Sequence, residues 1–183
     1  MPEYLTEKNL GLILNELFPD NDFIHDKAVP DSTNKRLRPD YRSDKMKIIL
    51  EFDGDSHYCK SQRIKTDIIK DMDYENLGYK VFRIPYFIQM SSELIKMIFD
   101  IDMKYEQKYP NGFIDKKAVL PADFCELGVE LFKKDLEKFS YCKDEILDSL
   151  NTKVQEKSDI ELVVPLSLKE YIYNKYLEIN IWP

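Results

Sequence analysis

The hydrophobic residues of this chain follow two different periods, and its first half contains both. Leucine and isoleucine recur at helical spacing over residues 5–18 and again over residues 60–77, which predicts two amphipathic helices. Four shorter apolar or alternating segments lie between and after them and predict strands. The predicted strands cover residues 23–29, 35–41, 46–53 and 79–84. The expected order is helix, three strands, helix, strand.

Turn signals connect these elements into one sheet. The cluster at residues 30–34 and a tight turn at residues 43–45 separate the first three strands, which predicts a three-stranded meander. Gly78 occupies the position of a helix C-cap after the second helix. A strand–helix–strand crossover then makes the last strand parallel to a neighbour. The fold class is therefore α/β, with a mixed central β-sheet flanked by helices.

The remainder of the chain is predicted to be helical. Its apolar spacing predicts four helices, at residues 91–105, 121–141, 144–154 and 166–179. We expect a core over residues 1–90 and an α-rich C-terminal extension over residues 91–183, packed on the core or forming a small subdomain.

The strand at residues 46–53 carries the candidate chemistry. Side chains alternate faces along a strand, so Ile49, Glu51 and Asp53 share one face. Two carboxylates on a buried face are costly unless something neutralises them, and a divalent metal is one such neutraliser. Asp40 supplies a third carboxylate if the preceding strand pairs with this one. The alternative is a carboxylate cluster that nearby Lys and Arg side chains satisfy without any metal.

Three further sets of residues have two interpretations each. Glu16, near the end of the first helix, is a solvated acid or an additional carboxylate near the metal. His57 lies four residues after Asp53 and is either structural or functional. Arg63, Asp67 and Lys70 share the polar face of the helix at 60–77, which is expected to be solvated. The apolar stripe expected to be buried on that helix comprises Ile64, Ile68, Ile69, Met72 and Leu77.

Charge is unevenly distributed along the chain. The net charge of −7 argues mildly against nucleic-acid binding, because phosphate affinity comes from Lys and Arg. Residues 27–47, however, hold seven basic residues against three acidic ones. A basic surface beside carboxylates is compatible with a polyanion bound over a metal site, and the alternative is a solvated charged loop. The candidate DNA contacts in this segment are Lys35, Arg36, Arg38 and Arg42.

Composition excludes several classes of protein. The chain contains no stretch of about 18 apolar residues, so we expect no membrane span. Its first residues include acids and lack an apolar core, so we do not expect a secretory signal. The three cysteines are odd in number and lack zinc-site spacing. We therefore expect a cytoplasmic protein with free thiols and no membrane partner.

Taken together, these motifs resemble the PD-(D/E)xK nuclease superfamily. The resemblance rests on Pro39-Asp40, on Glu51-x-Asp53-Gly54 with His57, on the helix bearing Asp67 and Lys70, and on the strand after Gly78. It is greatest to the branch of very-short-patch-repair endonucleases and small restriction enzymes, and it covers about residues 5–87. The family fold is a mixed sheet with an αβββαβ core. Its activity is metal-dependent phosphodiester hydrolysis.

The resemblance implies a role for each candidate residue. Asp40 and Glu51 match the two family acids and would bind Mg²⁺, for which Mn²⁺ can substitute. Asp53 stands where the family has lysine, and an acid-x-acid-Gly…His pattern without lysine recurs in the repair-like branch. Lys70, or else Lys60, from the following helix is the other candidate for that lysine.

The chemistry assigns further roles on the same scheme. Asp53 would be a further ligand or hold a metal-bound water, and His57 would act as general acid or base or contact the phosphate. Lys70 or Arg63 would offset negative charge in the transition state. Glu16 and Asp67 are possible additional residues of the site.

The expected function is that of a DNA endonuclease acting on double-stranded DNA. A type II restriction-type enzyme is the first hypothesis and a repair or nicking nuclease the second. The third is an inactive nuclease fold that works as a DNA-binding or protein-interaction module, which the absent lysine and the acidic net charge support. Cutting both strands of a duplex calls for two active sites, so a homodimer is the hypothesis for the restriction-type enzyme.

Overall fold

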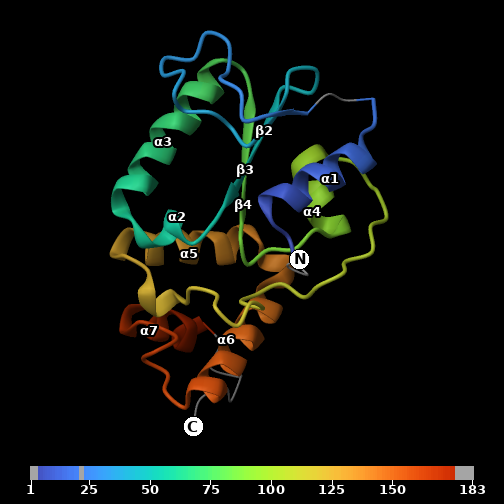
Figure 1. The fold of residues 1–183 in the computed structure, drawn as a ribbon. Helices are drawn as coiled ribbons and strands as arrows, with labels where there is room; N and C mark the ends of the chain where they lie inside the picture. The colour runs from blue at the N-terminus through green and yellow to red at the C-terminus, as the bar shows by residue number, and fades with distance from the viewer. Residues whose placement is uncertain (1–3, 21–22, 176–183) are drawn as a thin grey trace. The chain divides into compact units, whose positions relative to one another are not determined.

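The chain divides into two compact units in the computed structural model, which describes residues 4–20 and 23–175 (Figure 1). The first unit consists of Met1–Gly54 and Gln62–Tyr109, and the second of Asp55–Ser61 and Pro110–Pro183. This division differs from the expected one at residue 90. Residues 91–109 belong to the first unit, and a seven-residue segment after Gly54 belongs to the second.

The first unit is built on a four-stranded mixed sheet. Its strands β1 (Ile24–His25), β2 (Tyr41–Ser43), β3 (Ile48–Asp53) and β4 (Lys80–Pro85) lie in the order β1-β2-β3-β4. The first three strands pair antiparallel, as the predicted meander requires. β4 pairs parallel to β3, from Ile48 opposite Lys80 to Asp53 opposite Pro85. The mixed α/β class is confirmed.

Helices cover both faces of this sheet. Figure 1 shows α3 (Ser61–Asn76) on one side of the sheet, and α1 (Glu7–Leu17) and α4 (Ser92–Phe99) on the other. The Thr6 hydroxyl caps α1 by accepting a hydrogen bond from the Asn9 amide at 3.2 Å. α3 is the crossover between the parallel strands, and Gly78 after it has a φ of +83° that suits glycine. These elements follow the expected order.

Two predicted strands are much shorter than expected. The segment predicted as a strand at 35–41 is mostly turn, because Asn34 accepts hydrogen bonds from the amides of both Leu37 and Arg36. Pro39 also has no N–H to donate to a ladder. Asp40 therefore lies just before β2 instead of inside it. The predicted strand at 23–29 is reduced to the two residues of β1.

The predicted helix at 91–105 ends early. Asp100 adopts a left-handed conformation with φ of 57° and its N–H donates to the Lys96 carbonyl, which closes α4 at Phe99. The residues that follow, up to Tyr109, have no regular secondary structure.

The second unit is helical. It contains α2 (Ser56–Cys59), α5 (Glu126–Lys138), α6 (Lys143–Lys157) and α7 (Leu166–Lys175). The sequence predicts a loop at residues 54–58, but most of this segment lies in helix α2. The helix predicted at 121–141 is split, with 3-10 turns at Pro121–Asp123 and Ser140–Cys142 on either side of α5. The last residues of the helix predicted at 166–179 lie outside the described part of the chain.

A close contact joins α2 to α5 within this unit. Tyr58 is fully buried, and its hydroxyl donates a hydrogen bond to Asp135 at 2.7 Å. A Cβ at position 128 would lie 1.8 Å from the Tyr58 carbonyl oxygen, so only glycine allows this approach.

No helix within residues 4–20 and 23–175 has the length and apolar character that a membrane span requires.

Helix α3 buries Ile64 of its predicted apolar stripe, as expected, but it also turns two polar residues inward, contrary to expectation. Asp67 and Lys70 are buried, whereas Ile68, Ile69 and Met72 are 56%, 64% and 58% exposed. The reason is the sheet face beneath the helix, which carries buried charged side chains that need partners. Burying a charge without a partner costs more than exposing an isoleucine, so the charges decide which way the helix faces.

Candidate functional site

The face of β3 that meets α3 holds the candidate site. Ile49 packs in the core with Val29, Tyr74 and Tyr79, and the next two residues on that face are Glu51 and Asp53. Both carboxylates are buried, and each has a cationic partner. The predicted sharing of one face by these three side chains is confirmed.

Glu51 forms a buried ion pair with Lys70 of α3. The Lys70 Nζ donates to Glu51 Oε2 at 2.8 Å and to the carbonyl oxygen of Arg38 at 2.7 Å. Lys70 thus joins α3, β3 and the segment that leads into β2. The other carboxylate oxygen, Glu51 Oε1, is buried and has no hydrogen-bond partner among the residues that the structure describes.

Burial dominates the electrostatics of Glu51. It raises the pKa of the carboxyl to about 7, while Lys70 and Arg83 lower that pKa and Asp40 raises it further. The site therefore takes up or releases a proton near neutral pH.

Asp40 lies beside β3 next to Glu51. The pairing of Tyr41 with Leu50 continues the antiparallel register toward Asp40 and Glu51. Asp40 Oδ2 accepts a hydrogen bond from the Phe52 amide at 2.7 Å, which fixes the carboxylate against the strand. Burial raises the pKa of Asp40, although this backbone hydrogen bond opposes the rise. The structure thus brings Asp40, Glu51 and Lys70 together.

Asp53 belongs to a second charged cluster, centred on Arg83 of β4. Arg83 Nη1 lies 2.6 Å from Asp53 Oδ1, and the guanidinium makes two hydrogen bonds to Asp71 at 2.7 and 2.8 Å. Asp67 lies 3.5 Å from Arg83 Nη2 and 3.8 Å from Arg63 Nε. Burial alone would lower the pKa of Arg83, but Asp53 and Asp71 outweigh it and raise that pKa above its usual value.

Arg83 and Asp71 were not among the predicted site residues. One signal of their role is present in the sequence, since Arg83 stands between the apolar residues Phe82 and Ile84 in the middle of a strand. A charge at such a position needs a buried partner.

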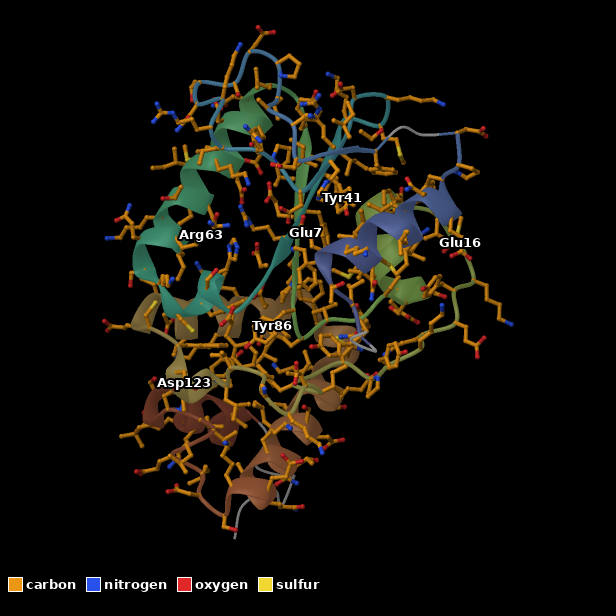
Figure 2. The ribbon with its side chains drawn as sticks, viewed as in Figure 1. Glu7, Glu16, Tyr41, Arg63, Tyr86 and Asp123 are labelled. Atoms are coloured by element: carbon orange, nitrogen blue, oxygen red, sulfur yellow. The ribbon has the colours of Figure 1, made fainter. Side chains whose placement is uncertain are left out.

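Two predicted site residues come from elements other than β3, β4 and α3. Glu16 is on α1, and Figure 2 shows it on the opposite side of the sheet from Arg63, so it is not brought to the carboxylates. It lines a separate pocket with Tyr105. His57 is in α2, in the second unit, where its side chain is buried.

The four candidate DNA contacts, Lys35, Arg36, Arg38 and Arg42, differ in where they lie. Arg36, Arg38, Arg63 and Lys70 line one pocket of about 260 Å³, together with Thr66 and the acids Asp26 and Asp67. Lys35 is exposed at the surface. Arg42 is buried, donates to the Ala28 carbonyl at 2.8 Å and lies 2.8 Å from Asp44, so it serves the fold and is not accessible to DNA.

The carboxylates of Asp40, Glu51 and Asp53 are the possible oxygen ligands for a Mg²⁺ ion at this site. Within the described residues no group of three or more His, Cys, Asp or Glu side chains is placed to hold a metal ion. Mg²⁺, however, usually takes one or two carboxylates plus waters and substrate phosphate. Asp40 and Glu51 supply that number, and Glu51 Oε1 is a buried oxygen without a donor. Asp53 is engaged by Arg83 and fits less well.

Comparison with known proteins adds no relative. No protein-family model, no curated protein and no solved structure matches this chain. The class that fold and site define is therefore a mixed α/β protein with a buried acid–lysine pair beside a basic pocket.

Glu51 makes the stability of the protein depend on pH. Its pKa of about 7 in the folded state lies above the ordinary value of 4.5, so folding favours the protonated carboxyl. The stabilisation from this group is complete below pH 4.5 and is lost as the pH rises through about 7. Relative to Glu51→Gln, which cannot titrate, the wild type should lose free energy of unfolding between pH 4.5 and 8. Urea unfolding of both proteins across this range measures the difference, and a constant difference would contradict it.

Proposed function

We propose that this chain is a metal-dependent DNA endonuclease, most closely a type II restriction-type enzyme that hydrolyses phosphodiester bonds in double-stranded DNA. The observation that carries the proposal is the buried Glu51 carboxylate, with one oxygen on Lys70 and the other without a donor, next to Asp40. A buried carboxylate that serves only the fold would have hydrogen-bond donors for both of its oxygens.

The element order supports the same function. The chain follows α1, the meander β1–β3, α3 and the parallel β4, which is the αβββαβ order of the nuclease family that the motifs resemble, with the short α2 added. On this proposal the two family acids are Asp40, just before β2, and Glu51, in β3.

The residues of the site suit phosphodiester hydrolysis. Asp40 and Glu51 would hold Mg²⁺ or Mn²⁺, which lowers the pKa of bound water and stabilises charge on the phosphate when it is present. Lys70 holds Glu51 in place and keeps a positive charge at the site for the transition state. Arg36, Arg38 and Arg63 border the same pocket as Lys70 and can bind the flanking phosphates of the DNA backbone.

Digestion of supercoiled plasmid with Mg²⁺, Mn²⁺ or EDTA tests the proposal. We expect discrete linear fragments with either metal, no cleavage in EDTA, and loss of cleavage in Glu51→Gln. Glu93→Gln, which makes the same change at an exposed position of α4 outside the pocket, is the matched control and should cleave. Cleavage by Glu51→Gln at the wild-type rate would refute the assignment of the site.

A second candidate is a nuclease fold without catalysis that binds DNA. The ion pair of Asp53 with Arg83 favours it, because the family lysine position is then taken by a structural acid. Such a module should bind a labelled duplex equally well in Mg²⁺ and in EDTA and leave plasmid, single-stranded and mismatched substrates uncut. Open circles as the sole product would instead indicate a nicking or repair enzyme.

A further inference from the structure

Helix α3 presents an apolar stripe to solvent. Ile68, Ile69 and Met72 are all more than half exposed, and Lys65 extends the same face by one turn. These four positions stand in the i, i+3, i+4, i+7 relation, which places them on one side of a helix. Three adjoining exposed hydrophobic residues on one helix are the kind of feature that marks an interaction surface.

The inward face of α3 explains why this stripe remains uncovered. Lys70, Asp67 and Asp71 pair with charged residues of β3 and β4 on the inward face, so the side of the helix that carries the stripe faces outward. The exposure of the stripe therefore follows from the way α3 packs on the sheet. The stripe extends over about two turns of this sixteen-residue helix.

Two charges flank the stripe and indicate its partner. Lys65 and Glu75 are exposed, and neither forms an ion pair with any residue that the structure describes. They lie five residues before and after Lys70, which is about 7.5 Å along the helix in each direction. A second α3 running antiparallel about this midpoint places Lys65 opposite Glu75 of the partner subunit, twice. A parallel pairing would bring like charges to the same level.

We propose that the outer face of α3 binds a second copy of this chain, with the two helices antiparallel about a twofold axis near Lys70. Ile68 then lies opposite Met72 of the partner subunit, and Ile69 lies near the axis. The interface is isologous, because one surface pairs with itself. This inference does not depend on cleavage, although a dimer would carry two Glu51–Lys70 sites, the number needed to cut both strands.

Sedimentation velocity of the full chain over a range of concentrations tests the interface. The wild type should sediment as a dimer, and Ile69→Asp should shift it to monomer with at least a tenfold rise in the dissociation constant. Leu162→Asp, which alters an exposed leucine of the second unit, is the matched control and should remain dimeric. Circular dichroism establishes that each variant is folded. A monomeric wild type, or a dimer unaffected by Ile69→Asp, would overturn the proposal.

Charge reversal distinguishes a second copy from any other partner. Lys65→Glu and Glu75→Lys should each weaken the homodimer, because each puts like charges opposite each other at both ends. An equimolar mixture of the two variants should regain dimer, since every opposing pair in the heterodimer is again of opposite sign. The double variant within one chain should also dimerise. Failure of both the mixture and the double variant to recover would refute the antiparallel pairing.

Discussion

Lys70→Met should reduce plasmid cleavage at neutral pH by at least a hundred-fold and destabilise the protein in a pH-dependent way. Lys70 is the cation that contacts Glu51, so its removal leaves a buried carboxylate without that partner and raises the pKa of Glu51 further. Breaking a buried ion pair costs about 3–5 kcal/mol. We expect a loss of that order at pH 8 and a much smaller one at pH 5, where Glu51 is protonated, measured by urea unfolding.

A double variant separates the fold from the chemistry. Glu51→Leu combined with Lys70→Met removes both charges, and apolar replacement of a buried pair is often neutral for stability. The double variant should therefore unfold near the wild-type urea concentration while remaining inactive. Lys70→Arg, which keeps the charge, should retain more stability than Lys70→Met. Wild-type cleavage by Lys70→Met would exclude Lys70 from the mechanism.

Arg83→Met should strongly destabilise the first unit at any pH near neutrality. It removes the cation that faces Asp53, Asp71 and Asp67, and the methionine cannot hydrogen-bond to any of them. The expected loss is about 3–5 kcal/mol in free energy of unfolding, visible as a lower urea midpoint by circular dichroism. Because ordinary domains have only about 5–15 kcal/mol of stability, partial unfolding at 37 °C is expected.

The controls for Arg83 use its geometry. Arg83→Lys keeps one charge but cannot reproduce the two parallel hydrogen bonds to Asp71, so its stability should fall between those of wild type and Arg83→Met. Adding Asp53→Asn to Arg83→Met removes one of the stranded charges and should recover part of the loss. No recovery would indicate that the guanidinium acts through packing alone.

Local sequence patterns were sufficient to predict the order and directions of the strands, although not the lengths of β1 and β2. The apolar run ending at Asp53 formed β3 with the predicted alternation, and Gly78 and the crossover placed β4 parallel to it. They also predicted that Asp40 would lie beside Glu51. In each case the determining interactions are short-range or follow from strand geometry, which a single sequence carries.

The orientation of α3 could not be predicted in the same way. Helical periodicity alone favours burial of Ile68, Ile69 and Met72, because the removal of hydrophobic surface from water usually decides which face of a helix packs inward. Buried charges on β3 and β4 turned this face of the helix outward instead. Predicting that orientation requires the pairing of Glu51 with Arg83 across the sheet, which is tertiary structure. The roles of Asp71 and Arg83 also depend on tertiary contacts, so the sequence did not predict them. Arg42 was predicted to contact DNA, but it is buried.

The course of the chain between the two units limits how this protein can be divided or recombined. It leaves the first unit after Gly54, returns at Gln62 and leaves again after Tyr109, so each unit is made of two separate segments of the chain. A truncation at residue 109 would keep α2 but remove Asp135 and the helix on which Tyr58 is buried. No single fusion junction transplants either unit intact. Because Gly54 directly follows Asp53, the second unit is covalently anchored one residue from the charged cluster, and any exchange of it in evolution or in the laboratory must also rebuild that end of β3.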